Sequence, residues 1–512
     1  MQRRQFLSRA AQLAGLALVP GVSAMASASS SQASPLVENY QRFHGALAQH
    51  PELALFAGVT GDLAGDARIE GRMPKDLNGV FFRNGPGRFD LGGERYHHWF
   101  DGDGFAQRWQ IADGKVSHIG KFVQTEKIKA ENQAGKFLYP TFGSQIERAA
   151  VKNSDSMNAA NTNLLPLNGS LYALWEGGSA LELDPLTLAT RGVKSWRADL
   201  KAMPFSAHPK VEPNGDLWNF GALPGADQMA LYRLNSKGEL AQFGMLKIPQ
   251  LAMVHDFAVS AAHLIFLVAP FDVVRREHSS FLDMHHWAGS GPQARGLRAI
   301  VISKADLSVR QIFELPPSMV FHLGNAYDDG DTTRLDAALI DDGKVMQNIS
   351  RTMRGEARKV RPARSYMAQI TLDYRRKQAR QERLFGASDF PRVMPQVVAA
   401  RHRKLALLSQ QQRALGDETF DSGFDGVAVV DTDSGKADRY QFGADWQVEE
   451  HIMVPRQHAK SETDGYLVGV LQNRRKPQTV LSVFDAAQVA AGPIALAHLD
   501  YRAPICFHGN FL

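Results

Sequence analysis

The sequence predicts an all-β protein whose short strands form the blades of a β-propeller. After residue 35, most of the chain consists of short β-favouring runs separated by Gly, Asn, Asp and Pro turns. In one recurring pattern a β run ends in a polar turn residue and another β run follows. This pattern occurs six times, at Asp184, Asn235, Lys304, Asp373, Asp431 and Asp485.

The intervals between those six residues are 51, 69, 69, 58 and 54. Such quasi-periodic hairpins are typical of propeller blades that differ in loop length, and about 480 residues at this spacing give seven or eight blades. No low-complexity linker divides the chain after residue 35. We therefore predict one propeller domain over residues 36–512, and the alternative is a multi-domain β protein with accidental similarity between its hairpins.

The composition narrows the possible functions. The chain has 512 residues, of which 44% are hydrophobic and 22% charged, and this excludes a wholly disordered or collagen-like protein. The net charge is +5, but the basic residues are scattered, which argues against a nucleic-acid partner. The single cysteine, Cys506, excludes an internal disulfide, a thiolate zinc cage and an iron–sulfur cluster. A metal would therefore depend on carboxylates and on the 17 histidines.

The N-terminal segment predicts export. Residues 1–28 combine Arg3-Arg4-Gln-Phe-Leu, an apolar stretch and small residues before a cleavage site, the order of a twin-arginine signal peptide. We expect export of the folded protein to the periplasm, where association with the membrane remains open. The alternative is an N-terminal membrane anchor, which the short and Gly/Pro-broken apolar run disfavours. Three of the positive charges belong to this segment, so the net charge says little about partners.

Two other segments have a clear expected structure. Residues 36–50 form a plausible short helix after the signal. Residues 251–270 are the only other long apolar stretch, but they contain His255, Asp256 and His263. Polar residues of this kind are costly inside a bilayer, so we expect a buried strand pair rather than a membrane span.

Four histidines lie in distinctive settings, each at the edge of an apolar run. They are His208 in Ser-Ala-His-Pro-Lys, His255 in Met-Val-His-Asp-Phe, His322 in Val-Phe-His-Leu-Gly-Asn and His508 in Ile-Cys-Phe-His-Gly-Asn. Their separations of 47, 67 and 186 residues match no local metal motif but fit one ligand per blade. Imidazole is a good ligand for Fe(2+), zinc or copper. For any one of the four alone, a hydrogen-bonded core histidine is the alternative.

Together, the four settings resemble the four histidine motifs of the carotenoid cleavage oxygenases. This family includes the retinal pigment epithelium isomerase and the stilbene-cleaving dioxygenases. Further stretches resemble family motifs in the same order, over about residues 70–512: Arg83-Asn84-Gly85-Pro86, Phe100-Asp101-Gly102-Asp103-Gly104, Leu174-Trp175-Glu176-Gly177 and Asp464-Gly465-Tyr466-Leu467. The resemblance implies a seven-bladed β-propeller with a loop and helix cap over one face.

The resemblance also implies a metal centre. It makes the four histidines the ligands of one Fe(2+) per chain, and it makes three carboxylates the hydrogen-bond partners of three of these imidazoles: Glu176, Asp389 and Glu450. Asp389 departs from the family, which has Glu at this position. Since Asp is one methylene shorter, it reaches the imidazole through a backbone shift or a water, or it loses the contact; we expect function to be retained. A second departure is His451, where the family usually has Pro.

The Phe-Asp101-Gly-Asp103-Gly stretch also invites a calcium-loop interpretation. The further ligands of an EF-hand loop are absent, so a tight turn whose side chains cap backbone N–H groups is favoured. For Cys506, two residues before His508, we expect a role in strand packing.

The predicted function is cleavage of a C=C double bond of a carotenoid or apocarotenoid by O2 to two carbonyl products. The protein holds the double bond near the iron in a dry, apolar site, and no side chain needs to act as a general base. Two alternatives stay open within the family: the rarer isomerase outcome and cleavage of a phenolic stilbene. A third alternative is a propeller that binds lipid or protein without catalysis.

Tyr96 and Lys127 raise the stilbene alternative. Stilbene-cleaving relatives use a Tyr and a Lys to hold the phenol, and these two residues lie in roughly the right stretches. Lys127 could equally be an ordinary surface charge. Because carotenoids reside in membranes, the resemblance also implies peripheral membrane contact through an apolar patch near residues 130–146. Its candidates, which could instead cap the propeller, are Phe137, Leu138, Tyr139 and Phe142.

Overall fold

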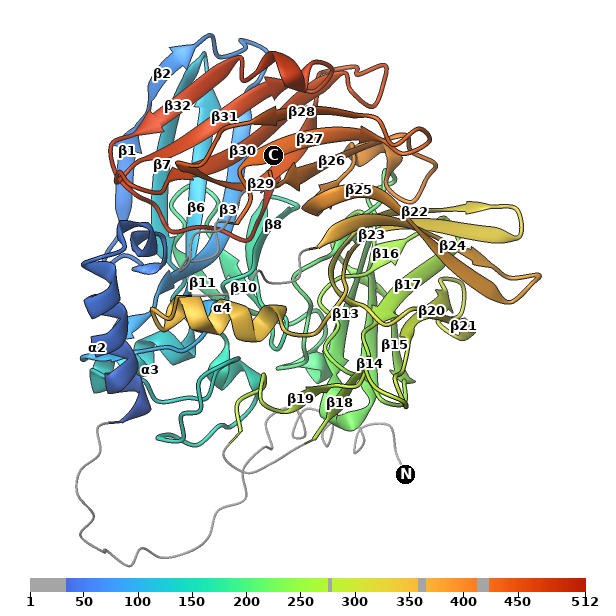
Figure 1. Cartoon of the computed structure of the whole chain (residues 1–512), viewed down its shortest axis with the longest axis horizontal. Coiled ribbons are helices and arrows are strands. Elements are labelled where there is room, and N and C mark those ends of the chain that lie inside the picture. The colour runs from blue at the N-terminus through green and yellow to red at the C-terminus, as the bar shows by residue number, and fades with distance from the viewer. Residues whose placement is uncertain (1–33, 275–278, 358–364, 412–422) are drawn as a thin grey trace, which may run out of the picture.

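The computed structural model describes residues 34–274, 279–357, 365–411 and 423–512. The predicted signal peptide, residues 1–28, lies outside these ranges. Strands account for 46% of the chain and helices for 12%, which confirms the all-β class. The strands form sheets around a central axis (Figure 1), and the protein is the predicted seven-bladed β-propeller.

The first four blades have the following strands, named from the outer edge of each blade towards the axis. Blade 1 contains β1 (Leu63–Asp66), β7 (Lys115–Phe122), β6 (Asp103–Ala112), β3 (Gly79–Arg88) and β33 (His508–Phe511). Blade 2 contains β11 (Thr190–Lys194), β10 (Ala180–Leu183), β9 (Ser170–Leu174) and β8 (Asn163–Leu167). Blade 3 contains β15 (Leu240–Lys247), β14 (Gln228–Leu234), β13 (Leu217–Leu223) and β12 (Lys210–Val211). Blade 4 contains β21 (Val309–Leu315), β20 (Leu297–Ser303), β17 (His263–Val268) and β16 (Ala258–Val259).

Blades 5 and 6 share one long strand, β25 (Gln378–Arg392). Its first part pairs with β24 and its last residues pair with β26, so the two blades join into a seven-stranded sheet. Blade 5 contains β25, β24 (Tyr366–Asp373), β23 (Thr332–Ile340) and β22 (Met319–Asp329). Blade 6 contains β28 (Ala437–Gln441), β27 (Gly426–Asp431), β26 (Lys404–Ser409) and the end of β25.

Blade 7 completes the ring with strands from both ends of the described chain. It contains β2 (Arg68–Gly71), β32 (Ala495–Leu499), β31 (Thr479–Asp485), β30 (Gly465–Asn473) and β29 (Trp446–Pro455). The early strand β2 forms the outer edge of this blade, while the C-terminal strand β33 pairs with β3 of blade 1. Early and late segments therefore pair in two neighbouring blades, and the closed ring leaves only short edges.

The six turn residues found in the sequence have equivalent positions. Each lies at the end of the third strand, counted from the axis, or in the turn that leads to the fourth strand, in blades 2 to 7. The equivalent turn of blade 1 is Asp113-Gly114 between β6 and β7, 71 residues before Asp184, and the recurring pattern did not single it out. Both residues of that turn have positive φ, which Gly tolerates at no steric cost and Asp tolerates better than most residues. The recurrence in the sequence is thus one turn per blade.

Helices and two small hairpins form a cap on one side of the propeller (Figure 1). They are α2 (Pro35–Leu47), α3 (Glu126–Ala134), α4 (Val345–Met353), the hairpin β4 (Asp90–Leu91) with β5 (Glu94–Arg95), and the hairpin β18 (Phe271–Val273) with β19 (His285–Trp287). Helix α2 is the helix expected at residues 36–50; helices α3 and α4 were not predicted. The fully buried Arg95 connects separate segments of the cap, because its guanidinium donates hydrogen bonds to the carbonyls of Phe56 and Met353.

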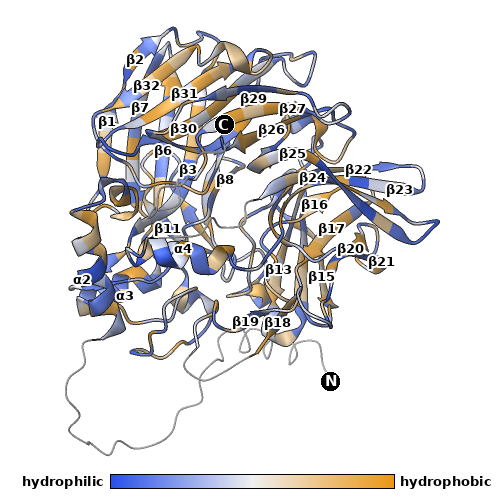
Figure 2. Cartoon of the chain, in the orientation of Figure 1, coloured by the Kyte–Doolittle hydropathy of each residue, from blue (hydrophilic) through white to orange (hydrophobic). Residues whose placement is uncertain are grey.

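The core lies within and between the blades, and hydrophobic residues concentrate on their strands, as on β30 and β31 in Figure 2. Residues 251–270 contain β16 and β17, which pair antiparallel and are buried, so the expected strand pair is present. In the described ranges, no helix has the length and apolar character needed to cross a membrane.

Candidate metal centre

Four buried imidazoles meet at the axis of the propeller. The ring centroids of His208 and His255, and of His208 and His508, are 4.3 Å apart. His322 completes a square, with centroids 5.0 Å from His255 and 4.9 Å from His508. The two diagonals are longer, at 5.6 and 5.9 Å. One ring nitrogen from each of the four lies within 4.8 Å of all the others.

The propeller explains why residues so far apart in sequence meet. His322, His508, Asp389 and Glu450 lie on the innermost strands of blades 5, 1, 6 and 7. His208 and His255 come just before the innermost strands of blades 3 and 4. Glu176 follows β9 in blade 2. Each of the seven blades thus contributes one group, four imidazoles and three carboxylates in total.

The three carboxylates bind the outer nitrogens of three imidazoles. Nδ1 of His255 bonds Glu176 Oε1, Nδ1 of His322 bonds Asp389 Oδ1 at 2.8 Å, and Nδ1 of His508 bonds Glu450 Oε1 at 3.0 Å. An ionised carboxylate only accepts hydrogen bonds, so each of these Nδ1 atoms carries the proton. Each Nε2 therefore presents its lone pair, and the carboxylate raises its basicity as a ligand.

This donor set fits a divalent metal ion. Nε2 of His255 lies 2.9 Å from Nε2 of His208 and 3.2 Å from Nε2 of His322. The lone pairs of His255 and His322 point at one another without a proton between them, an arrangement that a cation stabilises. Two nitrogens about 2.1 Å from one ion and at right angles to each other lie about 3.0 Å apart, which matches these distances.

His208 differs from the other three. Within the described part of the chain, no carboxylate hydrogen-bonds its Nδ1; Asp256 Oδ1 lies 3.9 Å away. That oxygen also lies 2.8 Å from Nζ of Lys210 and accepts the N–H of Phe257. The negative charge behind this ligand is therefore shared with a lysine.

The environment sets the protonation of the ligands. Burial, together with the neighbouring imidazoles, lowers the pKa of His208 and of His508, so both are neutral and able to bind metal. Burial opposes protonation of His255 as well, but the carboxylate of Glu176 outweighs it and raises the pKa. Burial acts against ionisation of Glu450, yet Arg392 and His508 lower its pKa, so this carboxylate is ionised.

Asp389 reaches its histidine directly in spite of its short side chain. The pairing of β25 with β26 slips between Asp389 and Arg392, which marks a bulge. The next residue, Phe390, has a φ of 56°, in the left-handed region that non-glycine residues avoid. The direct hydrogen bond is made from this bulged segment, and no water is needed to bridge the two side chains.

A cluster of aromatic side chains reaches the histidine square on one side. We call this group the aromatic wall: Trp99, Phe100, Phe142, Phe281, Phe321 and Phe507. It touches the metal ligands through Phe321, whose ring centroid is 5.6 Å from that of His255. On another side, the ring of Phe390 lies 4.4 Å from that of His322. The square therefore has apolar neighbours at these two places, beside the carboxylates that bind its outer nitrogens.

Tyr96 and Lys127 lie together in the cap, and both are fully buried. Lys127 Nζ donates to the hydroxyl of Tyr96 at 2.6 Å and to Asp103 Oδ1 at 2.8 Å. It also lies 3.1 Å from Glu131 Oε2. Lys127 is therefore not a surface charge. Arg88 completes a balanced cluster of two cations and two carboxylates.

The Asp101–Asp103 turn is built as a capping turn, as favoured from the sequence. Asp101 accepts the backbone N–H groups of His98 and Gly143 and the hydroxyl of Ser144. The Asp103 carboxylate is instead engaged by Lys127 and Arg88, so it is not available to calcium. Cys506 is buried, as expected for a packing residue.

Two of the four candidates for an apolar surface patch pack against other aromatic rings, as the alternative role in capping the propeller implies. Phe137 is fully buried, and its ring stacks on Tyr96 with centroids 3.7 Å apart. Phe142 packs on Phe100 in the aromatic wall. Phe137 therefore fills the space between the cap and the blades, whereas Phe142 is half-buried. Leu138 and Tyr139 are half-buried and remain candidates for a surface role.

Two residues close to the centre had no role from sequence reasoning. Arg83 is fully buried and donates to Glu449 at 2.9 Å and to the carbonyl of Glu450 at 3.0 Å. Arg83 belongs to the Arg-Asn-Gly-Pro stretch, and Glu449 stands directly before Glu450. In the sequence, the signal that could have pointed to Glu449 is its place directly beside Glu450.

The fold and the site define a class of protein: propeller oxygenases with a four-histidine metal centre. The chain belongs to the family described as retinal pigment epithelial membrane protein, which matches residues 59–512. A similar curated relative is the apocarotenoid-15,15'-oxygenase of Synechocystis, 27% identical, with 86% of this chain and 92% of the relative covered. Lignostilbene-alpha,beta-dioxygenase isozyme III of Sphingomonas paucimobilis is also 27% identical, over 88% of this chain and 94% of the relative.

A third relative is the isoeugenol monooxygenase of Pseudomonas nitroreducens, 26% identical over 87% of this chain and 94% of the relative. Among solved structures, a variant of the Synechocystis apocarotenoid oxygenase superposes with a TM-score of 0.81 at 24% identity. It covers 90% of this chain and 98% of that chain. The cobalt-substituted Synechocystis enzyme superposes equally well, with a TM-score of 0.81 at 22% identity over 93% of this chain and 98% of that chain.

Proposed function

We propose that this protein is a non-haem Fe(2+) dioxygenase that cleaves a C=C double bond of a carotenoid or apocarotenoid. The substrate and one O2 give two carbonyl products, each carrying one of the oxygen atoms. The observation that carries the proposal is the square of four buried imidazoles, three of which are hydrogen-bonded to carboxylates. The named activities of the relatives support an oxygenase, and those relatives include enzymes for carotenoids and for stilbenes.

Each group of residues has a distinct part in this reaction. Bound iron supplies the one-electron and O2 chemistry. The four histidines hold the ion. Because none of them is anionic, they do not reduce its charge of +2. The three carboxylates fix the imidazole tautomers and orientations. The aromatic wall and Phe390 offer apolar contacts to a conjugated chain and keep water from the reacting bond.

Oxygen uptake with product mass spectrometry tests this function. We expect the iron-loaded protein to consume one O2 per apocarotenal cleaved and to form two carbonyl products that both carry label from 18O2. A matched apo protein measures the metal-independent background. Isomerised substrate without oxygen uptake would replace the cleavage proposal by the isomerase outcome. No bound metal and no turnover would favour the non-catalytic binding propeller.

Cleavage of a phenolic stilbene is the second candidate, and one observation favours it. Tyr96 and Lys127 form a buried hydrogen-bonded pair in the cap, which suits recognition of a phenol oxygen. Asp103 and Glu131 already neutralise the lysine, which weakens this argument. Parallel assays with an apocarotenal and a hydroxystilbene separate the two candidates by their kcat/KM values.

We also propose that residues 1–28 direct folded protein to the periplasm, where Leu138 and Tyr139 contact the membrane. The sequence order of the signal supports export, and the partial exposure of these two side chains supports contact. Fractionation of cells that express the full chain tests export; replacing Arg3 and Arg4 by Lys should retain the protein in the cytoplasm. Co-sedimentation of the mature protein with lipid vesicles tests membrane contact.

A further inference from the structure

The C-terminal metal ligand is held by two consecutive glutamates of one strand. Glu449 and Glu450 follow each other on β29, and both are buried. On a regular strand, consecutive side chains face opposite sides of the sheet. The pairing of β29 with β30 slips between Val448 and His451, so the strand has one extra residue at this point. This bulge lets both carboxylates contact the last residues of the chain.

His451 holds the bulge in place. Burial lowers its pKa to about 3, so the ring is neutral. Its Nδ1 donates to the carbonyl of Glu449 at 2.8 Å, and its Nε2 accepts from the hydroxyl of Ser482 at 2.7 Å. The ring occupies the space next to Gly469, where a Cβ would lie 2.2 Å from Nδ1. A side chain at position 469 would therefore displace the ring.

The two carboxylates accept hydrogen bonds from the backbone on either side of His508. Glu449 Oε2 accepts the N–H of Cys506 at 2.8 Å, two residues before the ligand. Glu450 Oε2 accepts the N–H of Gly509 at 2.9 Å, one residue after it. Glu450 Oε1 is the partner of the imidazole itself. The backbone of the ligand is thus fixed at two points by neighbouring residues of a different blade.

Arg83 links these contacts to blade 1. Its guanidinium donates to Glu449 Oε2 at 2.9 Å and to the carbonyl of Glu450 at 3.0 Å. Gln472 donates to the other oxygen of Glu449 at 2.9 Å. Both oxygens of this buried carboxylate are therefore hydrogen-bonded, and its charge is paired. A paired, fully bonded carboxylate is a rigid anchor, whereas an unpaired one would be costly.

We propose that Glu449 is a positioning residue for the metal centre: with Arg83, it anchors the backbone of the C-terminal strand so that His508 is held in the ligand square. The inference rests on the proposed metal centre and adds to it a residue that touches neither metal nor substrate. Without this anchor the chain before His508 loses its contact at Cys506 and only Glu450 still holds the ligand, so His508 is less well ordered before the metal binds.

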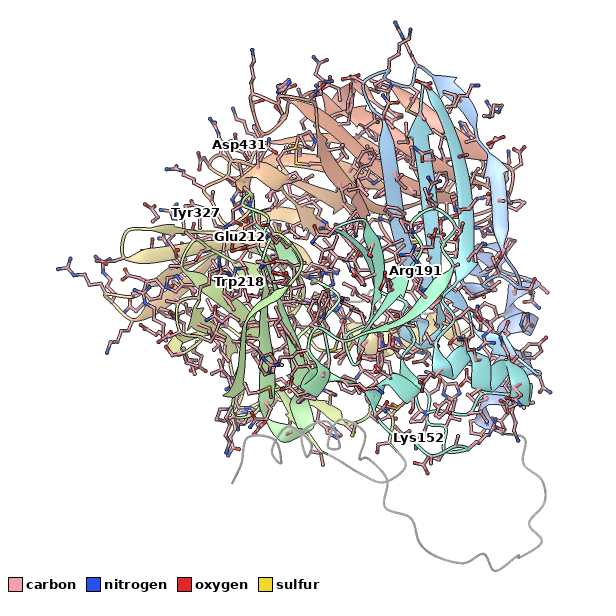
Figure 3. All side chains as sticks on the ribbon, turned by 180° about the vertical axis from the view of Figure 1, so that it is seen from behind. Lys152, Arg191, Glu212, Trp218, Tyr327 and Asp431 are labelled. Carbon is pink, nitrogen blue, oxygen red and sulfur yellow. The ribbon has the colours of Figure 1, made fainter. Side chains whose placement is uncertain are left out.

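Equilibrium binding of Co(2+) to the metal-free protein, followed by visible absorption, tests the inference without turnover. Loss of a partner outside the ligands typically lowers metal affinity about 10–100-fold. We expect a loss of this size for Glu449→Gln, with an altered absorption spectrum of the bound ion. The matched control is Asp431→Asn, a buried carboxylate at the end of β27 (labelled in Figure 3), which should leave affinity and spectrum unchanged.

A double-mutant cycle separates positioning from a general loss of stability. In a His508→Ala background, Glu449→Gln should change Co(2+) affinity less than twofold, because the ligand through which it acts is absent. If the two substitutions lower affinity additively, or if Glu449→Gln alone binds like the wild type, the inference is wrong. Should Glu449→Gln not fold, Glu449→Asp replaces it, since it keeps the charge beside Arg83 and withdraws the oxygen from Cys506. Failure of the wild type to bind Co(2+) would overturn the proposed metal centre instead.

Discussion

Asp389 Oδ1 lies 2.8 Å from Nδ1 of His322, a direct hydrogen bond made by a carboxylate one methylene shorter than glutamate. The bulge at the end of β25 and the left-handed backbone of Phe390 bring the short side chain within reach. The first prediction follows from this contact. Asp389→Asn keeps the shape but lacks the charge, so Co(2+) affinity should fall about 10–100-fold with little change in fold.

Asp389→Glu is the informative companion of that variant. Asp389 Oδ1 is already at hydrogen-bond distance from His322, so a longer side chain overfills a buried position, at a cost of about 1–3 kcal/mol in unfolding free energy. We expect lower thermal stability and no gain in metal affinity. Tighter metal binding by Asp389→Glu would show that the aspartate contact is a compromise and not a fitted arrangement.

The second prediction concerns His255, which is adjacent to two other imidazoles of the square. His255→Ala removes a ligand and leaves three imidazoles to hold the ion. We expect metal analysis after reconstitution to find far less than one iron per chain and oxygen uptake to fall to background. Unchanged turnover in this variant would contradict the dioxygenase proposal.

The third prediction is a pH dependence. Metal binding needs neutral His255, and Glu176 raises the pKa of this residue although burial opposes protonation. Below that pKa the metal must displace a proton, so affinity falls by up to about tenfold per pH unit. In Glu176→Gln the charge that raised the pKa is gone. The onset of acid loss should therefore move to lower pH, while affinity at about pH 8 should fall about 10–100-fold.

Titrations with Co(2+) at a series of pH values measure both effects. The Asp431→Asn protein is a suitable control because its substitution lies at the end of β27, outside the metal centre. An onset that stays at the same pH in Glu176→Gln, or that moves upward, would contradict the assigned role of Glu176.

The fourth prediction separates stability from substrate choice in the cap. Lys127→Met leaves Asp103 and Glu131 with Arg88 as their shared cation, and breaking a buried pair costs about 3–5 kcal/mol. This variant should lower the thermal midpoint whatever the substrate, so its activity alone cannot identify a phenol site. Tyr96→Phe removes only a hydroxyl, at about 1 kcal/mol. We expect it to leave apocarotenal turnover within about twofold and to raise KM for a hydroxystilbene.

The fifth prediction concerns His402, a buried histidine outside the metal centre. His402 Nε2 lies 2.6 Å from Asp336 Oδ2, and although burial acts in the opposite direction, this carboxylate raises the pKa of His402. The ion pair therefore stabilises the fold fully below about pH 6.5, the pKa of histidine in the unfolded chain. This contribution is lost as the pH rises through the higher pKa that His402 has in the folded protein. His402→Gln should lose more thermal stability at about pH 6 than at about pH 9. Equal losses would show that the imidazole is not charged in the folded protein.

The sequence by itself determined the fold class and the chemistry of the site. Turn residues such as Asp184 and Asp431 mark one turn per blade, because strand pairing places local turn signals at equivalent positions in each blade. A single cysteine and many histidines limited any metal site to imidazole and carboxylate ligands. These features are local or compositional, and so a sequence carries them directly.

Only the tertiary structure decided which groups meet and with what geometry. The contact of Asp389 depends on a bulge, the burial of Lys127 depends on a helix absent from the sequence prediction, and the inward orientation of Phe137 depends on the cap. Arg83 and Glu449 are 366 residues apart, and no local pattern relates them. Closure of the ring brings such residues together, because the propeller converts separations along the chain into adjacency at its axis.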